Sequence, residues 1–125
     1  MKYLCMVYIE EAKLAALSDE EFDQLDKDSL AYDKELRAGG YLIAAQALQS
    51  VQTATTLRVR KNKLSATDGP FAETKEQLCG FVLIEAKDLN DAIRVASKIP
   101  VAGVGSVEVR PVRELEEQER WDKRG

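Results

Sequence analysis

A chain of 125 residues has the length of one ordinary domain, and it can bury a hydrophobic core without metal or disulfide cross-links. Apolar residues make up 45% of the chain and charged residues 32%, which excludes a fibrous or an intrinsically disordered protein. The net charge is -4 and both signs are mixed along the chain, so no basic face and no direct nucleic-acid binding are predicted.

The first strand is expected over residues 2–9, where apolar residues dominate. Ser18 then begins a helix with a capping box, since Glu21 follows three positions later. The helix is expected to end at Gly39 and Gly40. Its core-facing residues, by their helical spacing, are Phe22, Leu25, Ser29, Tyr32 and Leu36.

A β-hairpin is predicted in the middle of the chain. Two short extended runs, residues 55–60 and 64–67, are joined by a turn at residues 61–63. Because Leu57 and Val59 alternate with basic residues, we expect one face of this hairpin to contact water.

Three further strands and a second helix complete the pattern. The strands are expected over about residues 41–48, over 78–85 and over 106–112, while Asp88 caps the helix and Pro100 marks its exit. The residues of this helix that are expected to face the core are Leu89, Ala92, Ile93, Ala96 and Ile99.

This order predicts an α+β fold, a ferredoxin-like βαββαβ sheet with an inserted hairpin and both helices on one side. Residues 3–9 and 81–84 are apolar on both faces of their strands, so the face without helices would expose a large apolar patch. We therefore predict a homodimer packed sheet face to sheet face. The alternative is a monomer whose hairpin or C-terminal tail covers the free face.

The chain divides into a domain of residues 1–113 and a charged tail of residues 114–125. The tail is expected to be solvated or frayed, and the alternative is that Trp121 anchors it to a partner subunit.

The N-terminal apolar run stops at Glu10, too short to cross a membrane, and it has neither the cationic start nor the cleavage pattern of a signal peptide. We expect a cytoplasmic protein that does not associate with membranes. Cys5 and Cys79 are therefore expected to be reduced and to pack as small hydrophobic residues. The alternative for Cys79 is a thiolate nucleophile, which needs a cation such as Lys75 to lower its pKa.

The segment most informative about function is residues 67–81, where a turn rich in polar side chains leads into an apolar strand. Asp68 is the best single candidate, as a catalytic and binding residue. Further binding candidates are Gly69, Phe71, Glu73 and Lys75. Lys75 is expected to bind an anionic group and to hold Asp68 or Glu73 ionised.

Each of these residues also has a purely structural explanation. Asp68 and Gly69 form a common turn pair in which Gly69 takes a positive φ. Phe71 is expected to fill the core beneath the loop, the alternative being a ring that stacks on a substrate, and the charged residues suit a solvated loop. Further, weaker candidates for the interior of a barrel are Tyr8, Gln46 and Arg110.

The run Asp68, Gly69, Pro70, Phe71 closely resembles the signature of the YciI-like (YCII-related) family, in its branch named for Asp-Gly-Pro-Phe, the DGPF branch. The likeness extends from near Met1 to about residue 112. It implies a dimeric α+β barrel, in agreement with the strand pattern, and it aligns Asp68 with the Asp of the family signature. It implies no single activity, because the family has none.

The chain contains no histidine. Some smaller YciI-like proteins are thought to use a His and Asp dyad, which cannot exist here, so lyase, isomerase or dehydrohalogenase activity is placed in doubt. A carboxylate alone acts as a base when burial raises its pKa. Metal sites built on histidine are excluded as well, and neither a metal nor another cofactor is predicted.

Three functions are considered. The first is binding of a small, including an anionic, molecule near Asp68, with or without proton-transfer chemistry. The second is a non-enzymatic accessory module, which the resemblance implies because this branch is often found beside or fused to extracytoplasmic-function sigma factors. The third is a structural oligomerisation domain, which would not need such a polar loop.

Overall fold

The fold is mixed α+β, with antiparallel sheets, in a computed structural model that describes residues 1–115. Four strands form the main sheet in the order β2-β5-β1-β6, and every neighbouring pair is antiparallel. They are β1 (Lys2–Ile9), β2 (Leu42–Ala47), β5 (Gln77–Glu85) and β6 (Ser106–Pro111). This order is compatible with the predicted ferredoxin-like sheet. The predicted role of Trp121 falls outside the described residues.

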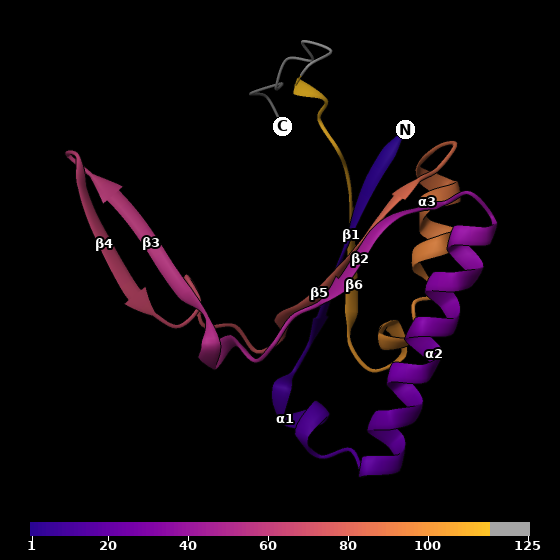
Figure 1. Cartoon of the computed structure of the whole chain (residues 1–125), viewed down its shortest axis with the longest axis horizontal. Helices are drawn as coiled ribbons and strands as arrows, with labels where there is room; N and C mark the ends of the chain where they lie inside the picture. Colours follow the sequence, from indigo (N-terminus) through magenta and orange to yellow (C-terminus); the bar gives the residue numbers. More distant parts are fainter. Residues whose placement is uncertain (116–125) are drawn as a thin grey trace.

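Two helices cover one face of the main sheet, whereas its other face carries no helix (Figure 1). They are α2 (Asp19–Ala38) and α3 (Leu89–Ala96). A short helix that the sequence analysis did not predict, α1 (Glu11–Ala15), lies between β1 and α2, and 3₁₀ turns form at Val51–Thr53 and Pro100–Gly103. In this described part, no helix is both long and apolar enough to cross a lipid bilayer.

The start of α2 is the predicted capping box. The Ser18 hydroxyl accepts the amide hydrogen of Glu21 at 3.1 Å, and the Glu21 carboxylate accepts the amide hydrogen of Ser18 at 3.0 Å. The helix ends at the predicted glycines, where Gly40 has a φ of +79°. Asp88 caps α3 as expected, because its carboxylate accepts the Asp91 amide hydrogen at 2.8 Å.

The hydrophobic core lies between the helices and the covered face of the sheet. Alternate residues of β1 are buried there, as the period of two in a strand requires. The main core residues are Tyr3, Cys5, Val7, Leu36, Val82, Ile84, Ala92, Val95 and Ile99.

The predicted core face of α3 is wrong at two positions. Leu89 and Ile93 are 48% and 49% exposed, and Val95 is buried instead. The buried stripe follows positions 92, 95, 96 and 99, an i, i+3, i+4, i+7 pattern rotated away from Leu89. On α2, Phe22 is also exposed, because the first turns of the helix extend past the end of the sheet (Figure 1).

The predicted hairpin is present as β3 (Thr55–Arg60) and β4 (Lys63–Asp68), which form a separate two-stranded sheet. Lys61 and Asn62 have φ values of 51° and 63°, as a two-residue hairpin turn requires. We call residues 55–68 the hairpin arm. It projects away from the main sheet (Figure 1), so it does not cover the free face as the monomer alternative needs.

Both faces of the hairpin arm contact water, although only one was expected to. Leu57, Val59 and Leu64 are 61%, 60% and 66% exposed. The reason is that the arm stands apart from the main sheet, so no layer of the described chain packs on its apolar side.

Candidate functional site

A groove of about 700 Å³ lies at the base of the hairpin arm, where the arm leaves the main sheet. Its volume is within the range of about 300–1,000 Å³ that is typical of ligand pockets. Three segments line it: the free face of the sheet, the connection from β2 into β3, and the loop between β4 and β5. The lining includes the side chains of Tyr8, Leu48, Thr56, Phe71, Thr74, Gln77 and Leu78.

The loop between β4 and β5 is fixed at its start by Gly69. This residue has the predicted positive φ, at 101°, and its amide donates to the Ala54 carbonyl oxygen at 2.7 Å. The Thr56 hydroxyl donates to the Gly69 carbonyl oxygen at 2.8 Å. These two bonds hold the loop against the beginning of β3 and so shape one wall of the groove.

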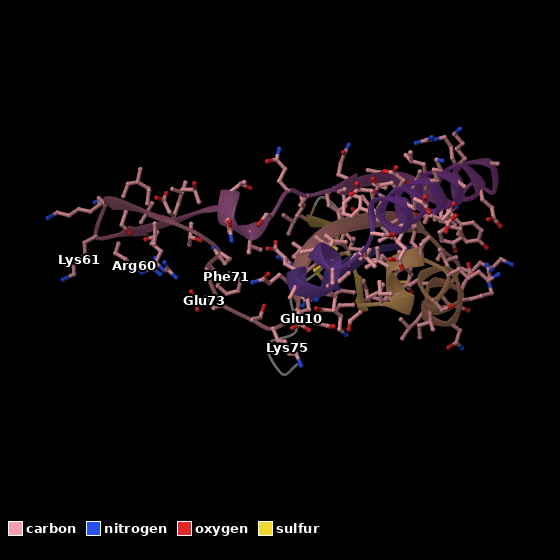
Figure 2. The ribbon with its side chains drawn as sticks, turned by 90° about the horizontal axis from the view of Figure 1, so that it is seen from below. Glu10, Arg60, Lys61, Phe71, Glu73 and Lys75 are labelled. Carbon is pink, nitrogen blue, oxygen red and sulfur yellow. The ribbon has the colours of Figure 1, made fainter. Side chains whose placement is uncertain are left out.

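Phe71 borders the groove and does not fill the core, so that expectation is wrong. Its side chain is 81% exposed. The loop that carries Phe71 follows the hairpin arm, which projects away from the packed side of the sheet (Figure 1), and Phe71 lies below the base of the arm in Figure 2. The stacking role that was the alternative for Phe71 stays a prediction.

Asp68 is the last residue of β4, paired with Thr55, and it is exposed. In the described part of the chain, its carboxylate makes no hydrogen bond or ion pair with another residue. Asp68 is not among the described residues that line the groove. Its catalytic assignment stays a prediction.

Glu73 and Lys75 are exposed on the same loop but do not line the groove. Lys75 projects outward from the molecule (Figure 2), and within residues 1–115 no ion pair joins it to Asp68 or Glu73. The polar residues that the structure does bring to the groove from this segment are Thr74 and Gln77.

Tyr8 connects the groove with a polar cluster on the free face of the sheet. Its hydroxyl donates to the Glu108 carboxylate at 3.5 Å, and the second Glu108 oxygen accepts from the Arg110 Nε at 3.1 Å and from its Nη2. The sequence analysis named Tyr8 and Arg110 but missed Glu108. The alternation of Ser106, Glu108 and Arg110 on β6 was the signal that could have identified it.

Neither cysteine is activated. Burial raises the pKa of the Cys5 thiol to about 11. Burial also raises the pKa of Cys79, and the Glu11 carboxylate adds to this effect, so the thiolate hypothesis for Cys79 fails. Both thiols are free, as predicted, although Cys79 is only half-buried.

Among the described residues, no group of three Cys, Asp or Glu side chains lies close enough together to bind one metal ion. The chemistry that the groove itself offers is therefore hydrogen bonding by hydroxyl and amide groups together with apolar and aromatic contact.

The sequence model of the YCII-related domain family matches residues 1–116 of the chain. The chain belongs to the YCII-related domain family. A similar protein is an uncharacterised protein of Rhizobium meliloti (strain 1021), 37% identical over 114 residues, which is 90% of this chain and 92% of that protein. The resemblance inferred from the sequence is thereby confirmed at the level of the family.

Proposed function

We propose that this YCII-related protein binds a small molecule in the groove at the base of the hairpin arm. The observation that carries the proposal is Phe71, whose ring is 81% exposed and stands at the groove. Large apolar groups that remain exposed beside a concave surface are typical of binding sites. The run Asp68 to Phe71 also supports assignment to the DGPF branch.

The lining of the groove indicates the kind of ligand. Its polar side chains, such as Tyr8, Thr56 and Gln77, carry hydroxyl or amide groups, and none of the side chains that line it is charged. Phe71 and Leu78 supply apolar contact. An uncharged ring or short chain with one or two polar groups fits this lining, and an anionic group would have to extend to Lys75 at the end of the loop.

Proton transfer is the second part of the proposal, with Asp68 as the base. Its carboxylate is exposed in the single chain, so we infer that it acts only when a bound ligand or a second subunit excludes water from it. A homodimer packed through the free face of the sheet would help to close the site. That face carries half-buried apolar residues, including Leu4, Met6, Phe81 and Leu83, and the groove adjoins it at Tyr8.

The proposal is tested by thermal denaturation with a panel of small phenols, phenolic acids and aliphatic carboxylates. A ligand at about 100 times its Kd stabilises the protein by about 2.7 kcal/mol, which raises Tm by several degrees. We expect such a rise for the wild type and its loss in Phe71→Ala. For ligands that carry an acidic proton, the rise in Tm is also expected to be lost in Asp68→Ala.

Leu89→Ala is the matched control, since it truncates another exposed apolar side chain on the far side of the sheet. It is expected to keep every ligand response. Two results would contradict the proposed site. One is a ligand that raises the Tm of Phe71→Ala as much as that of the wild type, and the other is a panel in which no compound raises the Tm of the wild type. A cytoplasmic location and an accessory role beside extracytoplasmic-function sigma factors stay predictions from the sequence.

A further inference from the structure

The hairpin arm presents an apolar face that the described chain leaves uncovered. In the strand register Leu57 lies opposite Ala66, and Val59 lies opposite Leu64, so the four side chains share one face. The three larger ones are all more than half exposed. A two-stranded hairpin is at best marginally stable in water by itself, so an apolar face of this kind favours a partner surface.

The tip and the opposite face of the arm are basic. They carry Arg58, Arg60, Lys61 and Lys63, and residues 55–67 contain no acidic side chain. In the described part, none of these four cations forms an ion pair. The net charge of -4 of the whole chain therefore hides a local basic surface, which the sequence analysis did not expect. Figure 2 shows Arg60 and Lys61 near the end of the arm.

A second apolar surface adjoins the base of the arm, on the side of α1 and the start of α2. A hollow of about 360 Å³ is formed where β1 leads into α1 and α2, and its apolar lining includes Leu14, Leu17 and Phe22. We call it the α1–α2 hollow. Phe22 is 40% exposed there, a large ring that the fold of one chain does not cover.

The rim of the α1–α2 hollow is acidic. Glu11 and Asp19 line it, and the helix that begins at Asp19 carries eight acidic and three basic side chains. The acidic residues are concentrated in its first half. This surface thus has the charge sign opposite to that of the tip of the arm, so an apolar contact between the two would bring unlike charges near each other.

A single chain cannot bring the two surfaces together. In Figure 1 the arm projects from its base away from α1 and from the start of α2, so its tip is remote from the hollow of its own chain. We propose that the hairpin arm of one copy docks in the α1–α2 hollow of a second copy. Leu57, Val59 and Leu64 cover the apolar lining, and the cations at the tip face the carboxylates of α1 and α2.

This interface would also affect the groove. Leu48, Gln49 and Ser50 line both the groove and the α1–α2 hollow, so an arm seated in the hollow lies next to the proposed ligand site. The proposed contact does not involve Leu4, Met6, Phe81 or Leu83, the apolar residues of the free sheet face. It therefore does not depend on the proposed function or on packing of one sheet face against another.

The test is a charge exchange, read out as the assembly size and dissociation constant by analytical ultracentrifugation. Arg60→Glu with Lys61→Glu is expected to weaken self-association by about tenfold or more, because like charges then meet. Adding Asp19→Lys and Glu20→Lys in the same chain restores opposite charges and is expected to restore association. Lys34→Glu with Lys98→Glu, at exposed positions elsewhere, is the matched control and is expected to leave association unchanged.

A second measurement keeps the outcome independent of any folding defect in these variants. Wild-type chains labelled with ¹⁴N and ¹⁵N are mixed and treated with a reagent that joins amines to carboxylates. Hybrid cross-links between Lys61 or Lys63 and Asp19 or Glu20 are expected.

Four results would each overturn the proposal. They are a wild type that stays monomeric, an arm variant that associates normally, a lack of rescue by the exchanged charges, and cross-links that occur only within one chain. Binding of a DNA or RNA oligonucleotide by the arm, without self-association, would assign the basic face to nucleic acid instead.

Discussion

The hydroxyl of Tyr32 donates a 2.6 Å hydrogen bond to the carbonyl oxygen of Val95, which joins α2 to α3. The bond is partly buried, and this burial raises the pKa of Tyr32, an effect to which the Glu35 carboxylate adds. Tyr32→Phe keeps the ring but removes the donor, so we expect the free energy of unfolding to fall by about 1 kcal/mol in urea denaturation. Tyr8→Phe, which removes a 3.5 Å bond, is the control and should cost less. Equal decreases in the free energy of unfolding in the two variants would contradict a stabilising role for the Tyr32 hydrogen bond.

Gly105 lies where two backbone segments approach closely. A Cβ atom at this position would be 2.0 Å from the Tyr8 carbonyl oxygen, and backbone atoms cannot move aside as a flexible side chain can. Gly105→Ala is therefore expected to lower the free energy of unfolding by about 2–3 kcal/mol. At Gly103 a Cβ atom would meet nothing within 4 Å, so Gly103→Ala should change stability by less than about 0.5 kcal/mol. If Gly105→Ala left the free energy of unfolding unchanged, the backbone at Gly105 would have to move away from β1 at little cost.

The capping box predicts a dependence of stability on pH. The backbone amide of Ser18, and then its side chain, lower the pKa of Glu21 below its ordinary value of 4.5. A carboxyl whose pKa is lower in the folded state stabilises the protein above its unfolded pKa, and this contribution is lost as the pH falls through the folded pKa. Glu21→Gln does not titrate, so the wild type should exceed this variant in stability near neutral pH and lose that advantage in acid.

The measurement is urea denaturation of both proteins at about pH 7 and about pH 2.5. Glu20→Gln is the control, because in the described residues the Glu20 carboxylate accepts no hydrogen bond. An advantage of the wild type that persisted in acid would assign the effect to packing of the side chain and not to its charge.

Thiol labelling tests the state of the two cysteines. Because burial raises the pKa of Cys79, native Cys79 is expected to react with iodoacetamide more slowly than the same thiol in the urea-unfolded chain. Cys5 is completely buried and should stay unlabelled until the protein unfolds. Cys79→Ser identifies which thiol reacts. Labelling of native Cys79 faster than in the unfolded chain would revive the nucleophile hypothesis.

Local signals in the sequence were sufficient for most elements of the fold. The caps at Ser18 and Asp88 and the hairpin turn at Lys61 and Asn62 depend on neighbouring residues only, and all three are confirmed. The rotation of α3 about its axis was not predictable in this way. Helical spacing shows that an apolar stripe exists, but only packing against the sheet decides whether it includes Leu89 or Val95.

The candidate site was harder to predict because it joins distant parts of the chain. The loop beginning at Asp68 was recognised, and the turn at Gly69 is as expected. The groove, however, depends on β1 bringing Tyr8 beside Phe71, which follows from the strand order and the direction of the hairpin arm. The alternation on β6 could have placed Glu108 on one face with Arg110, but its contact with Tyr8 depends on the register of β6 with β1.

The position of β1 in the middle of the sheet has a consequence for biosynthesis. Val7 lies between Gly80 of β5 and Val107 of β6, so β1 is paired only with strands that are translated much later. At about 5–20 residues per second, roughly 5–20 s pass before both neighbours have been translated. During that interval the apolar residues on both faces of β1 remain exposed to water.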